Sequence, residues 1–272
     1  MRRRKYLALW LFVAPAFPLP AYAQAQPAPQ SHPPPAAAPE PEHPAIKPAA
    51  VQMLQATSRR LAGLKSMTFT VVSTYESIAR TGQSLYFTTQ SEVTVQRPNK
   101  LRVLTPGDGP ASDFYYDGKT MMAYAPVENL VAIADAPPTM AAMLLAAYDQ
   151  AAIYFPFSPI LAADPYKNLS DGLSSAFVVG QSHLVDGVVT DMVAFTNKNV
   201  QGEIWIGVDD GLPRMYRINY LKDPQHLHYQ VDLYDWNPNV KLAPGDFTSA
   251  QALKAPHMKF ARPDAPAKSR TD

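Results

Sequence analysis

The chain of 272 residues contains no cysteine. This absence excludes disulfides, thiol nucleophiles, thiolate metal sites and a lipid-modified N-terminal cysteine. Charged residues make up only 17% of the chain, and no basic face suggests nucleic acid as a partner. A Walker loop, a dinucleotide fingerprint and a calcium loop are also missing. The sequence therefore predicts no cofactor, no metal site and no catalytic residue, and stability must come from a hydrophobic core.

Near its N-terminus the chain has an apolar stretch that is too short to span a membrane, because it has about half of the ~20 residues needed. This stretch, Tyr6–Ala16, follows a basic head at Arg2–Lys5 and precedes the small residues Ala21–Ala23. That layout is typical of an export signal. We expect cleavage after Ala23, which removes four basic residues, takes the formal net charge from +1 to −3 and places the mature chain in the periplasm. Because the basic head contains adjacent arginines, both the ordinary secretory route and the twin-arginine route stay open.

Proline-rich segments flank the part of the chain that looks folded. Residues 24–48 contain nine prolines and almost no large apolar residue, which indicates a disordered Pro/Ala-rich linker. At the other end, prolines, alanines and basic residues from Pro256 onward indicate a frayed end. We predict a folded domain over 49–260 and a disordered tail over 261–272.

Within the domain, hydrophobic periodicity predicts two helices and many strands. Apolar residues recur at helical spacing over Pro48–Ser66 and over Thr139–Tyr148, with Thr139 as the N-cap of the second helix. The segment Tyr154–Asp164 is apolar without periodicity and indicates a loop or a short helix. Strand-like segments bounded by turn residues lie at 68–77, 84–96, 100–105, 114–116, 120–124, 127–134, 176–182, 188–196, 202–208, 213–220 and 226–236.

This pattern predicts an α+β fold that is mainly antiparallel β. Short turns between consecutive strands favour a meander, and a sheet of about eleven twisted strands curls. A curled sheet that covers two or more helices is a half-barrel with a concave interior. Aromatic, aliphatic and methionine side chains are available to line a hydrophobic cavity or its cover, although each is also ordinary core material: Met140, Met143, Leu144, Tyr148, Trp205, Tyr216, Ile218, Tyr220 and Trp236.

The sequence offers candidate residues for a metal site and for a serine-hydrolase site. His226 and His228 share one face of a predicted strand with Asp232, which is a geometry for zinc or copper. A further metal ligand close in sequence is lacking. Polar residues at alternate positions on a solvent-exposed strand face explain the spacing equally well. His183 and Ser174 do not form a serine-hydrolase pattern, because the G-x-S-x-G elbow is missing.

Several short motifs carry a family resemblance. The segments 114–120, 164–166, 204–206, 212–214 and 235–236 resemble an uncharacterised family of predicted bacterial periplasmic proteins, over about residues 50–250. That family is similar in fold to the lipoprotein-carrier half-barrel of LolA, LolB and RseB. The resemblance implies a hydrophobic cavity under helices, binding rather than catalysis, and one arginine that controls opening. The candidates for this arginine are Arg102, Arg214 and Arg217.

The sequence thus leads to two functional hypotheses. The first is a periplasmic, non-enzymatic binding protein for a hydrophobic or amphipathic ligand, such as a lipid or the acyl chains of a lipoprotein, with transient contact to a membrane surface. The alternative is an envelope protein-interaction or stress-sensing module that has the same fold and no lipid ligand.

Overall fold

The computed structural model describes residues 45–107, 110–225 and 227–262. The predicted export signal, most of the predicted linker, His226 and residues 263–272 of the predicted tail lie outside these described residues. Within the described ranges, no helix combines the length and the hydropathy needed to cross a membrane.

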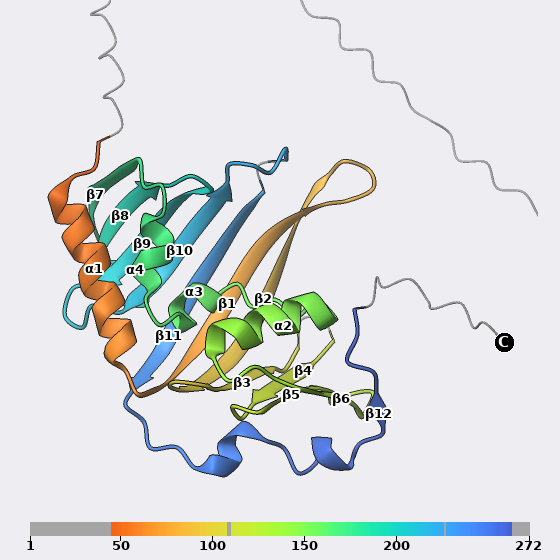
Figure 1. Ribbon diagram of the computed structural model, residues 1–272. Coiled ribbons are helices and arrows are strands. Elements are labelled where there is room, and N and C mark those ends of the chain that lie inside the picture. The colour runs from red at the N-terminus through yellow and green to blue at the C-terminus, as the bar shows by residue number, and fades with distance from the viewer. Residues whose placement is uncertain (1–44, 108–109, 226, 263–272) are drawn as a thin grey trace, which may run out of the picture. The chain divides into compact units, whose positions relative to one another are not determined.

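Twelve strands form one curved sheet, which Figure 1 shows from its concave side. Their order is β12-β6-β5-β4-β3-β2-β1-β11-β10-β9-β8-β7, and all neighbours are antiparallel except the short pair β12 and β6. The predicted class, an α+β half-barrel that is mainly antiparallel, is confirmed. The strands are β1 (Ser66–Ile78), β2 (Ser84–Gln96), β3 (Lys100–Thr105), β4 (Ser112–Tyr116), β5 (Thr120–Ala125), β6 (Leu130–Asp135), β7 (Ser175–Ser182), β8 (Thr190–Thr196), β9 (Val200–Gly207), β10 (Pro213–Tyr220), β11 (His228–Pro238) and β12 (His257–Met258).

Two meanders make up this sheet, and they join where the first strand meets the eleventh. β1–β6 follow one another through short turns, and β7–β11 do the same. The antiparallel pairing of β1 with β11 places Val71 opposite Leu233 and Tyr75 opposite Tyr229. Because side chains alternate between the two faces of a strand, both pairs lie on the concave face.

Four helices lie on the concave face of the sheet (Figure 1). They are α1 (Pro48–Gly63), α2 (Met140–Ala151), α3 (Ser158–Leu161) and α4 (Pro165–Ser170). The predicted cap of α2 is confirmed, since the Thr139 side chain accepts a hydrogen bond from the backbone N–H of Ala142. Helix α4 was not predicted from the sequence. It begins with Asp164 as N-cap and Pro165 in the first turn.

The main core fills the space between these helices and the concave face. Leu54 and Leu61 on α1, Met143 on α2 and Phe157 before α3 are buried in it together with Phe69 of β1. Burial of apolar area contributes roughly 25 cal/mol per Å². This core therefore holds the helices against the sheet in the absence of disulfides.

The C-terminal segment corrects one prediction. After β11 the chain forms two short 3-10 helices, η1 (Pro244–Phe247) and η2 (Ala252–Lys254), and then β12, which pairs with β6. Ala252 and Ala255 join a second core cluster with Tyr115, Met122, Tyr124 and Val131. The prediction that the chain frays from Pro256 is wrong for residues 256–260, because β12 is hydrogen-bonded to the sheet edge and Phe260 packs against the main core.

Candidate ligand-binding site

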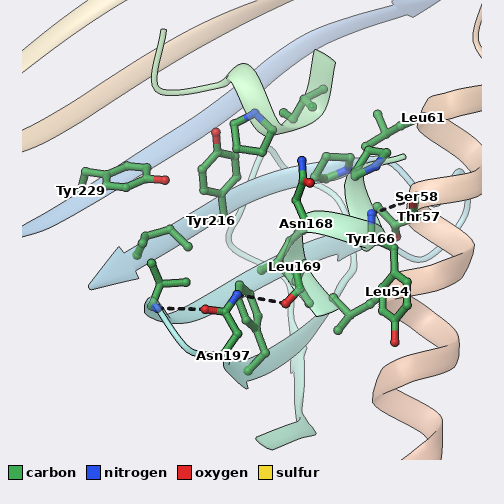
Figure 2. A pocket seen from close by; sticks show the side chains of 18 residues that line it. Leu54, Thr57, Ser58, Leu61, Tyr166, Asn168, Leu169, Asn197, Tyr216 and Tyr229 are labelled. Carbon is green, nitrogen blue, oxygen red and sulfur yellow. Dashed lines mark hydrogen bonds between the residues drawn. The ribbon is translucent and has the colours of Figure 1, made fainter. Parts of the chain in front are cut away.

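A cavity of about 240 Å³ lies between the helices and the strands of the second meander. We call it the inner cavity, and Figure 2 shows it from close by. One wall comes from α1 and contains Leu54, Thr57, Ser58 and Leu61. Because these residues recur at three- and four-residue steps, they share one face of the helix. The predicted apolar stripe of the first helix thus becomes a wall of the inner cavity.

The opposite wall comes from the concave face of β8–β11. Ile204 of β9 pairs with Tyr216 of β10, and Ile218 of β10 pairs with Gly202. Tyr229 of β11 stands opposite Ile218. These side chains and Phe195 of β8 present apolar surface to the inner cavity, with tyrosine hydroxyl groups beside it.

We call α3 and α4 the helical cover, and the Ser58 side chain fixes it to α1. The Ser58 hydroxyl donates to the Asp164 carboxylate over 3.1 Å and accepts from the backbone N–H of Tyr166 over 3.0 Å. The same carboxylate accepts the backbone N–H of Lys167. The start of α4 is therefore held on α1, beside the wall residues Thr57 and Leu61.

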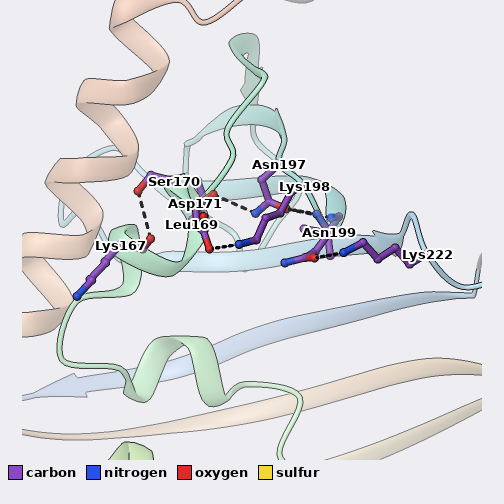
Figure 3. Close-up of polar contacts among 9 residues, drawn as sticks. Lys167, Leu169, Ser170, Asp171, Asn197, Lys198, Asn199 and Lys222 are labelled. Atoms are coloured by element: carbon purple, nitrogen blue, oxygen red, sulfur yellow. Dashed lines mark hydrogen bonds and ion pairs between the residues drawn. The ribbon is translucent and has the colours of Figure 1, made fainter.

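A second polar cluster holds the end of α4 on the turn between β8 and β9 (Figure 3). The Asn197 side chain donates to the carbonyl of Leu169 over 3.0 Å and accepts the backbone N–H of Val200, also over 3.0 Å. Lys198 forms an ion pair with Asp171, directly after α4. Contacts hold both ends of α4, and α4 forms a wall of the inner cavity.

Arg97, at the end of β2, binds the middle of the cover. Its Nη1 donates to the carbonyl of Leu161 over 3.0 Å, and its Nη2 donates to the carbonyl of Ile160 over 3.2 Å. Burial lowers the pKa of the Arg97 guanidinium below its ordinary value. Ile160 lines the inner cavity, so Arg97 fixes a wall residue through its backbone.

The three arginines named from the sequence lie elsewhere. Arg214 pairs with Asp186 and Asp210 at the turns of the second meander. Arg217 lies over the Trp205 ring, 5.3 Å from its centroid, and Arg102 donates to Thr94 on β2. None of them is among the residues that line the inner cavity. No sequence signal separated Arg97 from these candidates, because its partners are backbone carbonyls more than sixty residues away.

The inner cavity has no charged side chain among its lining residues. Burial raises the pKa of Tyr216 well above its ordinary value, and nearby Tyr154 and Tyr220 raise it further. Its hydroxyl stays protonated and donates to the carbonyl of Pro156 over 2.9 Å. The Thr57 hydroxyl is buried and has no hydrogen-bond partner among the described residues. An environment of this kind favours an apolar, uncharged occupant.

A second hollow of about 520 Å³ lies at the end of α2, and we call it the outer pocket. Tyr148 and Tyr154 are about half exposed there, and Leu145 is 60% exposed. Its lining residues are Leu144, Leu145, Tyr148, Ile153, Tyr154, Phe155, Ser158 and Tyr220.

The structure divides the nine predicted site residues between several places. Tyr216 and Ile218 line the inner cavity. The outer pocket is lined by Leu144, Tyr148 and Tyr220. Met140 and Met143 are buried in the main core and line neither space.

The two tryptophans of the prediction also line neither space. Trp236 stacks on Phe69 at 4.5 Å and donates its indole N–H to the carbonyl of Pro213. Trp205 alternates with Ile204 along β9 and therefore points to the face opposite the inner cavity, where Arg217 covers it. Both are placed to stabilise the sheet.

The histidines of the sequence analysis have separate surroundings. The Nδ1 of His228 lies 3.2 Å from the Glu76 carboxylate, and His226 lies outside the described residues. In the described ranges, no three histidine, aspartate or glutamate side chains lie close enough together to hold a metal ion.

The curved sheet, the helices on its concave face and the apolar cavity define an α+β half-barrel. The chain belongs to the family described as "Predicted periplasmic protein (DUF2092)", whose model matches residues 50–261. This match confirms the resemblance that the short motifs indicated. No curated protein matches the chain in sequence.

Solved structures with a similar course of the chain are much more distant. Mycobacterium bovis LprF shares 18% identity, with a TM-score of 0.47, over 74% of this chain and 98% of that one. MucB also shares 18% identity, with a TM-score of 0.45, over 75% of this chain, but the match spans only 63% of MucB. A LolA superfamily protein from Nitrosomonas europaea shares 8% identity, with a TM-score of 0.35, over 74% of this chain and 98% of that one. These similarities concern the fold alone.

Proposed function

We propose that this protein is a periplasmic, non-enzymatic binding protein that takes a hydrophobic or amphipathic ligand, a lipid or the acyl chains of a lipoprotein, into its inner cavity. The observation that carries this proposal is a cavity of about 240 Å³ with no charged lining residue. Burial of an apolar chain there would contribute roughly 25 cal/mol per Å². The family description as predicted periplasmic agrees with the export signal expected from the sequence.

Release of the ligand requires the helical cover to move. α3 and α4 both line the inner cavity, and they are held by the contacts of Arg97, Ser58 and Asn197. Among the described residues, the hydrogen bonds of the Arg97 guanidinium go to backbone carbonyls, so they can break without leaving a buried carboxylate behind. We therefore assign the control of opening to Arg97.

The binding proposal is tested by titrating the mature protein with N-phenyl-1-naphthylamine, a dye whose fluorescence increases in an apolar environment. Phospholipid or an acylated peptide is then added as a competitor. The proposal predicts saturable dye binding that both competitors reverse. A flat fluorescence signal at every dye concentration would contradict it.

A second candidate function is the envelope protein-interaction or stress-sensing module. The observation that favours it is the free edge of β7, where Phe177, Val178 and Val179 are 44%, 37% and 50% exposed. Among the described residues, the only pairing on this edge is the bridge between Ile46 and Ala176. An exposed apolar edge strand is a template for an extended peptide. A photo-crosslinking residue in place of Phe177 would capture such a partner, and adding Val179→Lys to that variant should abolish the capture.

A further inference from the structure

Five tyrosines connect the inner cavity with the outer pocket, and we call them the tyrosine band: Tyr148, Tyr154, Tyr216, Tyr220 and Tyr229. The rings of Tyr148 and Tyr154 lie 6.5 Å apart, those of Tyr220 and Tyr229 5.7 Å, and those of Tyr216 and Tyr229 6.2 Å. Tyr154 and Tyr220 line the outer pocket together, and Tyr220 contributes to the raised pKa of both Tyr154 and Tyr229. Since Tyr216 and Tyr229 line the inner cavity and the other three line the outer pocket, the two spaces share one aromatic boundary.

The sizes of the two spaces suggest different contents. The inner cavity, at about 240 Å³, is larger than the ~150 Å³ that holds benzene and smaller than the ~300–1,000 Å³ of a usual ligand pocket. It can take one slim apolar chain, but the polar end of an amphiphile has to stay outside. The outer pocket, at about 520 Å³, lies directly beyond the tyrosine band.

The chemistry of the outer pocket disfavours an amphiphile whose polar head is charged. None of its lining residues is charged, and its polar atoms come from three tyrosines and Ser158. Burial raises the pKa of Tyr154, which lines this pocket, above its ordinary value. The same desolvation penalises any other anion that enters. Hydroxyl groups both donate and accept hydrogen bonds, which suits a partner made of hydroxyl groups.

One cation touches the rim of the outer pocket. Arg262 lies 5.4 Å from the centroid of the Tyr148 ring and donates to the backbone carbonyl of Tyr148 over 3.2 Å. These contacts hold the Arg262 guanidinium against a wall residue, and Arg262 is not among the residues that line the pocket. The hydroxyl groups of the tyrosine band therefore remain the main polar groups that a head would meet.

We propose that the outer pocket binds the uncharged, hydroxyl-bearing head of a lipid, such as glycerol or a sugar, while the apolar chain occupies the inner cavity. This inference rests on the proposed function and narrows its ligand class. Tyr154 and Tyr220 are the positions that select the head, because both line the outer pocket and each carries a hydroxyl group.

The test compares two ligands that share one acyl chain, decanoylglycerol and decanoate, by calorimetric titration of the whole mature protein. We expect wild type to bind decanoylglycerol at least about tenfold more tightly than decanoate, because decanoate would bury an unpaired charge. Tyr154→Phe and Tyr220→Phe keep the rings and remove the hydroxyls. Each should weaken the binding of decanoylglycerol about fivefold, as expected for one lost hydrogen bond. The affinity for decanoate should stay unchanged.

Tyr86→Phe is the matched control, because Tyr86 is 67% exposed and lies outside the tyrosine band. It should bind both ligands as wild type does. Equal binding of the two ligands by wild type, or unchanged head preference in both Phe variants, would overturn the inference and leave the proposed function standing. Failure of both ligands to bind would overturn the inference and the proposed function together.

Discussion

The guanidinium of Arg97 donates a hydrogen bond of 3.0 Å to the backbone carbonyl of Leu161, the last residue of α3. This contact joins the end of a sheet strand to the helical cover across 64 positions of the chain. A second bond, to Ile160, fixes a residue that lines the inner cavity. Arg97 thus ties α3 to the end of β2 through two backbone partners.

Arg97→Met should loosen the cover, because it keeps much of the aliphatic stem and removes both hydrogen bonds. Two carbonyls then lose their partner, at a cost of about 1–3 kcal/mol. We expect dissociation of a bound apolar dye to accelerate about tenfold in stopped-flow displacement. Arg80→Met, at the exposed tip of the β1–β2 hairpin, is the control and should dissociate at the wild-type rate. An unchanged rate of dye dissociation in a folded Arg97→Met variant would show that Arg97 does not control opening.

Val200→Phe should block the inner cavity. Val200 is only partly buried and lines the cavity at the start of β9, so a larger ring can extend into the empty space. Filling a cavity often adds about 0.5–2 kcal/mol of stability. We expect at least about tenfold weaker dye binding with no decrease in Tm. Val208→Phe, at a residue that is 46% exposed, should bind dye normally; equal binding by both variants would place the dye elsewhere.

The two sides of α2 should respond differently to an aspartate. Met143 is fully buried, so Met143→Asp buries a charge without a partner and should cost about 3–5 kcal/mol or prevent folding. Leu145 is 60% exposed, and Leu145→Asp should change the free energy of unfolding by less than about 0.5 kcal/mol. Urea unfolding followed by circular dichroism measures both. A similar loss in the two variants would mean that α2 is not packed as described.

Asp113→Asn should stabilise the protein at neutral pH. Burial raises the pKa of Asp113 above its ordinary value, so the ionised carboxylate disfavours the folded state. This cost is present at pH 7 and disappears as the pH falls through the raised pKa, because wild type then becomes protonated. The variant retains an acceptor for the Tyr115 hydroxyl, 3.2 Å away. Its Tm should exceed that of wild type at pH 7, by a difference that shrinks in acid; a difference that grows in acid would contradict this.

Much of the fold was predictable because its strands are bounded by clear turns. The predicted strands 84–96, 100–105 and 213–220 coincide with β2, β3 and β10. The predicted strand 127–134 began too early, since residues 126–129 form a turn with Asn129 in the left-handed region. β12 escaped prediction because two residues carry no periodicity, and its position depends on the distant edge of β6.

The site was less predictable, because alternation shows which residues share a face but not which face is hollow. Tyr216 and Ile218 are two residues apart on β10 and therefore share a face, and both line the inner cavity. Trp205 was grouped with them on hydrophobicity alone, although its neighbour Ile204 is the residue that lines the cavity. The walls supplied by α4 depend on the long-range contact between Ser58 and Asp164, which no local pattern shows.

The most direct test of the central claim is native mass spectrometry of the mature protein, purified from a periplasm without detergent and followed by solvent extraction. The account predicts a near-stoichiometric lipid adduct on wild type and little or none on Val200→Phe. A wild-type protein that carries no lipid, and still carries none after incubation with phospholipid and lipoprotein, would contradict it.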